Sequence, residues 1–162
     1  MVENHATAPA RAARRSTTLI AALVAACMLL LGLAATASAR LDRAERATIH
    51  AINHVRHRHG LHGVRISGRM CTGADAHSRF MARHNYATHG AWAARVSRYA
   101  HSRTIGEILG WVAGGHQVGT IMSMWMHSSG HRAVILNGAY RRVGIGRRRG
   151  YGHTFYTVDF AR

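Results

Sequence analysis

An uninterrupted apolar run, Leu19–Ala35, constrains this chain more than any other feature of its sequence. Three arginines (Arg11, Arg14 and Arg15) precede the run, and the small-residue pattern Ala37–Ala39 follows it, directly before polar sequence. A basic segment, an apolar segment and an A-x-A pattern in this order are typical of a cleavable secretory signal peptide. Residues 1–39 are therefore predicted to direct export to the cell envelope or the outside. The alternative is that the apolar run is retained as a membrane anchor.

Cleavage after Ala39 leaves residues 40–162, a mature chain of 123 residues without a permanent membrane span. This part contains a single cysteine, Cys71, so that no disulfide can form within it. The domain must then be stabilised by its hydrophobic core, in which we expect Cys71 to lie as a free thiol. The sequence has no proline-rich linker and no internal repeat, which predicts one compact domain.

Helical signals dominate the first two thirds of the mature chain. Asp42 and Glu45 have the spacing of a capping pair, and the helix they open is predicted to end near Gly60. A second helix is expected from Ser67 to about Asn85. Residues 88–103 show no clear periodicity. Apolar positions at helical spacing predict a third helix that includes Ile121 and Trp125, followed by a short helical turn at 131–136.

Strand signals are concentrated at the C-terminus. Residues 143–146 and 154–160 alternate between apolar and other residues and flank a glycine-containing turn near Gly150, as in a β-hairpin. The apolar, glycine-rich segment 106–115 fits either a short strand or a loop. Helices followed by a hairpin predict an α+β domain.

Four segments give the mature chain a resemblance to a known family. In chain order they are INHVRHRHGL (52–61), HSRFMARHNYATH (77–89), IGEILG (105–110) and WMHSSGHRAVILNGAYRRVGIG (125–146), with YTVDFA (156–161) fitting a last strand. Their order and spacing resemble the bacterial branch of the CAP superfamily, also called the SCP domain family. The resemblance implies an α-β-α sandwich with a small antiparallel sheet.

The resemblance also implies a cavity that holds two histidines and two acidic residues. By motif, the histidines correspond to His89 and His131, and one acid corresponds to Glu107. Ser128 occupies the position of the second acid. This departure weakens the case for acid–base chemistry by paired carboxylates.

Two neutral imidazoles and a carboxylate suit a divalent metal such as zinc, with His89 and His131 as the ligands. A hydrogen-bonded cluster that supports the cavity wall is an equally good interpretation. A metal-dependent hydrolase centred on His89, Glu107 and His131 is less well supported. No serine lies in a nucleophile-elbow pattern, and Ser128 has no assigned base apart from nearby His131. We therefore expect a binding protein rather than an enzyme.

Charge suggests further partners. The mature chain has 19 arginines and five acids, and one arginine cluster lies beside the predicted hairpin: Arg141, Arg142, Arg147, Arg148 and Arg149. With Arg56 and Arg58 this cluster is a candidate anion-binding surface. For an exported protein, an anionic envelope polymer or lipid is a better partner than nucleic acid, for which no motif is present. A cationic protein that binds the envelope or membrane is thus another alternative. The aromatic residues also allow a small apolar ligand, or simple core packing.

Overall fold

The structure is a computed structural model that describes residues 41–115 and 117–162. The signal peptide predicted for residues 1–39 lies outside the described residues. The helices are α2 (Arg43–Arg58), α3 (Gly68–His84), α4 (Trp92–Ala100), α5 (Val118–His127) and α6 (Ser129–Ile135). The strands are β1 (Arg65–Ile66), β2 (Ile105–Ala113), β3 (Arg142–Gly150) and β4 (His153–Ala161). Among these described helices, none is both long and apolar enough to cross a bilayer.

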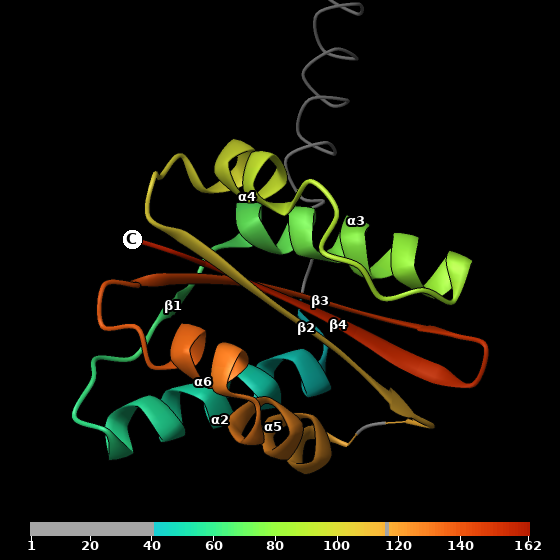
Figure 1. Cartoon of the computed structure of the whole chain (residues 1–162), viewed down its shortest axis with the longest axis horizontal. Helices are drawn as coiled ribbons and strands as arrows, with labels where there is room; N and C mark the ends of the chain where they lie inside the picture. Colours follow the sequence, from blue (N-terminus) through green and yellow to red (C-terminus); the bar gives the residue numbers. More distant parts are fainter. Residues whose placement is uncertain (1–40, 116) are drawn as a thin grey trace, which may run out of the picture. The chain divides into compact units, whose positions relative to one another are not determined.

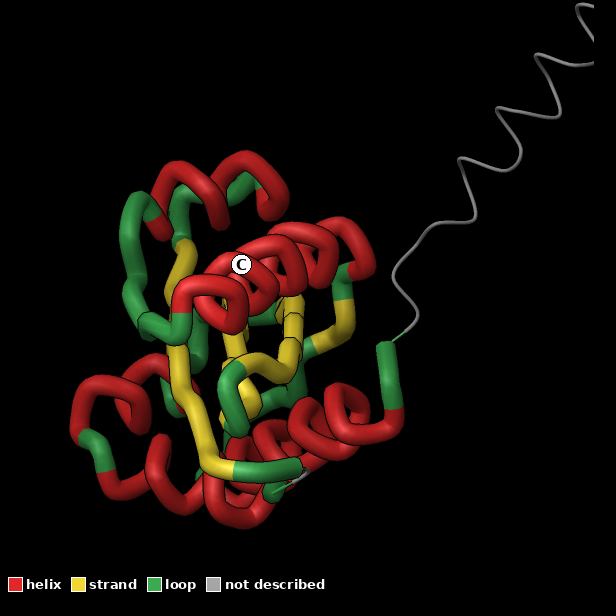
Figure 2. The backbone as a smooth tube through the Cα atoms, turned by 90° about the vertical axis from the view of Figure 1, so that its right-hand side faces the viewer, coloured by secondary structure: helices red, strands yellow, loops and turns green. Residues whose placement is uncertain are grey.

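The sheet forms the middle of three layers. Helices α3 and α4 cover one face, and α2, α5 and α6 cover the other (Figure 1). The view from the side shows the same arrangement, with helices above and below the strands (Figure 2). This confirms the predicted α+β class and the α-β-α sandwich.

The strand order is β1-β3-β4-β2. Strand β4 is antiparallel to both β2 and β3, whereas β1 pairs in parallel with β3 through Arg65 and Ile66. The three long strands form the small antiparallel sheet that was predicted, and the short β1 adds a parallel edge that makes the sheet mixed. A two-residue strand is too short to carry a period-2 pattern, so its sequence gave no strand signal.

Both helix starts predicted from capping residues are confirmed. Asp42 accepts a hydrogen bond from the Glu45 amide, and the Glu45 carboxylate accepts one from the Asp42 amide, which completes a capping box at α2. Ser67 is the N-cap of α3. The segment that lacked a clear pattern contains α4, and the ambiguous segment around Glu107 is the nine-residue strand β2.

Two layers meet unusually closely where α3 crosses β3. A Cβ atom added to Gly144 would lie 2.4 Å from the Met70 carbonyl carbon, and one added to Gly146 would lie 2.3 Å from the Asp75 amide nitrogen. Only glycine permits such an approach of helix backbone to strand backbone. Beside this contact Cys71 is buried in the core, as expected.

Candidate functional site

The candidate site lies along β2, which is an edge strand of the sheet. His89 comes from the loop between α3 and α4, Glu107 from β2 and His131 from α6. His89 and His131 line one hollow of about 280 Å³. Ser128 and His131 line a second hollow of about 370 Å³. Three of the four residues selected by resemblance, His89, Ser128 and His131, therefore line two adjoining hollows, whereas Glu107 lines neither.

Glu107 orients the first histidine. Its side chain is almost fully buried, with 1% exposed, and accepts hydrogen bonds from His89 Nδ1, at 2.7 Å, and from Arg95. An ionised carboxylate can only accept hydrogen bonds, so Nδ1 of His89 carries the ring proton. In the neutral ring this leaves a lone pair on Nε2. The carboxylate thus selects the tautomer in which Nε2 can act as a ligand.

The loop that carries His89 is held in place by a second histidine. His77, buried on α3, donates a hydrogen bond from Nε2 to the Thr88 carbonyl at 2.7 Å. Burial lowers the pKa of His77, and the charge of Arg95 lowers it further. A neutral His77 is sufficient for this bond, since only one ring N–H is needed. His77 is thus a buried histidine of α3 whose Nε2 hydrogen bond is satisfied within the domain.

Both cavity histidines favour the neutral form. Burial lowers the pKa of His89, and the nearby Arg95 adds to this effect. Burial also lowers the pKa of His131, with a smaller contribution from His89. Since an ordinary histidine titrates at about 6.5, these shifts leave both imidazoles unprotonated at neutral pH. Neutral imidazole is the form that binds metal ions.

A second buried carboxylate, which sequence reasoning missed, lies beside Glu107. Asp159 on β4 is directly opposite Glu107 in the strand register, and 1% of the residue is exposed. Its Oδ1 atom has no hydrogen-bond partner among the described residues. Burial raises the pKa of Asp159 to about 7, although Arg95 opposes the shift. The signal in the sequence is an acidic residue within the otherwise apolar and uncharged strand segment 154–160.

This burial makes the stability of the domain depend on pH. The folded-state pKa of Asp159, about 7, lies above the ordinary 3.8, so the folded protein binds more protons than the unfolded chain between these values. The contribution of Asp159 to stability is therefore lost as the pH rises through this window. We expect Asp159→Asn to raise the free energy of unfolding at about pH 8 by about 1–3 kcal/mol and to change it little at about pH 4.

Urea unfolding of both proteins across this range measures the difference, in which the other titrating groups largely cancel. If the variant is less stable at about pH 8, the attraction between Arg95 and ionised Asp159 exceeds the cost of burying the charge, contrary to this prediction.

The sequence of the domain matches a known protein family. The sequence model of the Cysteine-rich secretory protein family (CAP) matches residues 49–160. The chain belongs to this family. The matched segment of this CAP domain includes His89, Glu107, Ser128 and His131. A search among curated proteins found no match.

Solved structures agree with the CAP assignment. An outer surface protein of Borrelia burgdorferi has a TM-score of 0.65 and 18% sequence identity. The matched region covers 74% of this chain and 94% of the Borrelia chain. A venom allergen-like protein of Schistosoma mansoni has a TM-score of 0.63 and 12% sequence identity. The matched region covers 75% of this chain and 89% of the Schistosoma chain. At these identities the likeness concerns the fold.

An extracellular SCP-domain protein of Bacillus anthracis is also similar, with a TM-score of 0.62 and 25% identity. It covers 76% of this chain, whereas this chain spans only 44% of the Bacillus protein. The Bacillus protein is thus an extracellular protein that contains an SCP domain, and the Borrelia protein of similar fold is an outer surface protein.

The described residues of this CAP domain offer at most the two imidazoles as neighbouring metal ligands. No three His, Cys, Asp or Glu side chains within the described ranges are grouped so as to hold an ion together. Glu107 already accepts hydrogen bonds from His89 and Arg95. If His89 and His131 held a metal ion, Glu107 would lie behind His89, and any further ligand would have to be water or a bound molecule.

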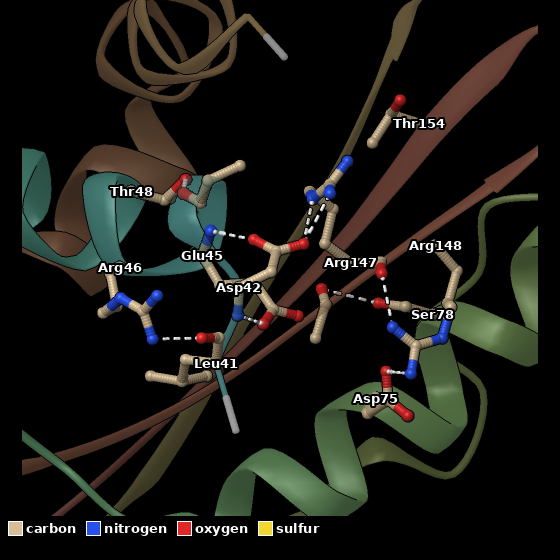
Figure 3. A network of polar contacts seen from close by, with 12 residues as sticks. Leu41, Asp42, Glu45, Arg46, Thr48, Asp75, Ser78, Arg147, Arg148 and Thr154 are labelled. Atoms are coloured by element: carbon tan, nitrogen blue, oxygen red, sulfur yellow. Dashed lines mark hydrogen bonds and ion pairs between the residues drawn. The ribbon is translucent and has the colours of Figure 1, made fainter. Parts of the chain in front are cut away.

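The arginine cluster is divided between the two faces of the sheet, because neighbouring side chains of a strand point to opposite faces. Arg147 pairs with Asp42 at 2.5 Å, and Arg148 pairs with Asp75 at 2.6 Å (Figure 3). Arg142 donates to the carbonyl of the last residue, and Arg141 donates to the Gly138 and Tyr140 carbonyls. Anion binding by Arg141, Arg142, Arg147, Arg148 and Arg149 stays a prediction. For Arg56 the expectation of an accessible cation was wrong, since the residue is fully buried.

Proposed function

We propose that this CAP domain is an exported binding protein whose cavity binds a divalent ion, zinc above all, through His89 and His131. The signal-peptide pattern of residues 1–39 and the extracellular relative support the export. The proposal concerns binding, with the remaining coordination positions filled by water or by the ligand.

The orientation of His89 is the observation that carries the metal proposal. Glu107 accepts a hydrogen bond from Nδ1–H of His89, which leaves the basic lone pair on Nε2, on the far side of the ring from Glu107. Carboxylate–histidine pairs of this kind commonly stand behind metal ligands. His131 faces the same hollow, and its buried Nδ1 has no hydrogen-bond partner among the described residues. Such an atom is costly unless a ligand or water satisfies it.

The same contacts weigh against the hydrolase alternative. Catalytic zinc sites normally have three protein ligands and an open position, whereas this cavity supplies two imidazoles. Glu107 is also engaged by both His89 and Arg95, so it has little freedom to act as a general base. Ser128 lies at the junction of α5 and α6, next to His131 in the second hollow, which supports contact with a ligand.

Zinc titration calorimetry tests the proposal. We expect the purified protein to bind zinc at one site per chain with a Kd about tenfold or more below that of its other, weaker histidine sites, because Glu107 orients one of the ligands. The double variant His89→Ala/His131→Ala should lose this site. The matched control is His50→Ala/His54→Ala, which removes two exposed histidines one turn apart on α2 and should keep it.

Identical titrations of the parent protein and the cavity variant would contradict metal binding at this site. They would leave His89, Glu107 and His131 as a hydrogen-bonded support of the cavity wall.

A further inference from the structure

A third hollow, of about 380 Å³, lies beyond the histidines along the same strand. Its lining is aromatic and amphipathic: Asn85, Tyr86, Ala87, Trp111, His153 and Phe155. Two of these aromatic side chains are exposed to an extent unusual for their size, with Trp111 46% and Tyr86 62% exposed. Large aromatic surfaces left in water around a concavity are typical of binding sites rather than of packing.

The indole of Trp111 is held in a fixed orientation. Trp111 lies on β2 opposite Phe155, and the edge of the neighbouring His153 ring packs against it with ring centroids 4.7 Å apart at 81°. Phe155, 3% exposed, belongs to the core. A platform on paired strands loses little conformational freedom when a ligand stacks on it.

The polar groups of the hollow define the chemistry of the ligand. The described residues that line it include no arginine, aspartate or glutamate, so none of them balances the charge of a phosphate or an ammonium group. It does offer the Asn85 amide, the Tyr86 hydroxyl and His153, whose buried Nδ1 has no partner among the described residues. A purely apolar ligand would leave that nitrogen unsatisfied. The lining suits an uncharged ring that has an apolar face and polar substituents at its edge.

We propose that this hollow, the Trp111 hollow, binds a sugar ring of an uncharged oligosaccharide, with the ring stacked on Trp111. A pyranose has such an apolar C–H face, and its hydroxyl or acetamido groups can both donate and accept hydrogen bonds. The hollow lined by His89 and His131 adjoins the Trp111 hollow along β2. Ala87 and Trp111 line the His89/His131 hollow as well, and that hollow shares Leu109, Met124 and His131 with the hollow beside Ser128.

A linear chain of sugar rings could therefore continue from Trp111 toward the histidines. This proposal deepens the binding function proposed above by naming a ligand class, but stacking on Trp111 does not require the metal. The two proposals can accordingly fail separately.

Calorimetric titration with tetra-N-acetylchitotetraose and with cellotetraose tests the proposal; the second sugar lacks acetamido groups. We expect saturable binding of at least one of these sugars with a Kd at or below about 10 mM. Trp111→Ala should raise this Kd about tenfold or more. Tyr86→Ala should weaken it as well. Phe80→Ala, which removes an aromatic side chain of similar exposure on α3 outside the hollow, should bind like the parent protein.

Melting curves of each variant exclude unfolding as the cause of lost binding. Repeating the titration with EDTA and with His131→Ala separates the two proposals, because sugar binding that survives both treatments stands without the metal. The proposal is overturned if neither sugar binds. It is also overturned if Trp111→Ala binds as well as the parent protein, or if laurate binds in a Trp111-dependent manner while both sugars fail.

Discussion

Replacement of Arg56 by methionine is expected to destabilise the domain by about 3–5 kcal/mol, more than any other single substitution proposed for this protein. Arg56 stands near the end of α2 and is completely buried. No acidic side chain within the described residues pairs with it. Its guanidinium instead donates to four backbone carbonyls at 2.6–3.3 Å, those of His62, Ile135, Asn137 and Tyr140.

The His62 carbonyl belongs to the loop after α2, whereas the other three carbonyls come from the end of α6 and from the loop between α6 and β3. Arg56 therefore ties the first helix to the segment leading into the central strands. Methionine approximates the length of the side chain but donates no hydrogen bond, so it would leave buried carbonyls unsatisfied. Lysine retains the charge without the planar fork and should give an intermediate loss.

Guanidinium chloride unfolding followed by circular dichroism measures this effect. Arg58→Met is the matched control, because Arg58 lies on the same helix and is exposed, and surface substitutions usually change stability by less than about 0.5 kcal/mol. If Arg56→Met were as stable as Arg58→Met, water or a rearranged loop would have to satisfy the four carbonyls.

The contrast between Arg56 and Arg58 shows where sequence reasoning stopped. Both are arginines in the last turn of one helix, and charge alone placed both in an anion-binding surface. The face of a helix that is buried follows from the apolar positions, and Arg56 lies on that buried face with Ile49 and Ile52. The sequence near Arg56 does not reveal which carbonyls accept hydrogen bonds from its buried guanidinium, because these acceptors lie 6 to 84 residues away.

Local signals, by contrast, predicted their elements well. Capping residues at Asp42 and Ser67 marked helix starts, and alternation marked β3 and β4. Strand β1 and helix α4 were not predicted, because one is two residues long and the other has no side-chain cap. Motif resemblance located His89, Glu107 and His131. It could not find Asp159, which becomes part of the site only through the pairing of β2 with β4.

Substitution of Gly146 by alanine is the second large effect that we expect, and it tests the packing that brings these distant elements together. The added methyl group would lie 2.3–2.4 Å from backbone atoms of Ala74 and Asp75 in α3. Real Cβ atoms do not approach so closely, and a helix backbone cannot move aside as a flexible side chain can. Helix α3 would have to shift from β3, which predicts a loss of about 3 kcal/mol.

The same shift would disturb two buried hydrogen bonds, because Ser78 Oγ lies 2.8 Å from the Gly146 carbonyl and 2.9 Å from Thr157 Oγ1. Gly119→Ala is the control: it lies in α5 with no atom near the added methyl group, and alanine is the better helix former by up to about 1 kcal/mol. Thermal unfolding should therefore show a large decrease in midpoint for Gly146→Ala and no decrease for Gly119→Ala. Equal midpoints would mean that α3 and β3 are farther apart than the structure places them. Because α3 carries His77, which holds the loop of His89, a shifted α3 should also weaken zinc binding at the proposed site.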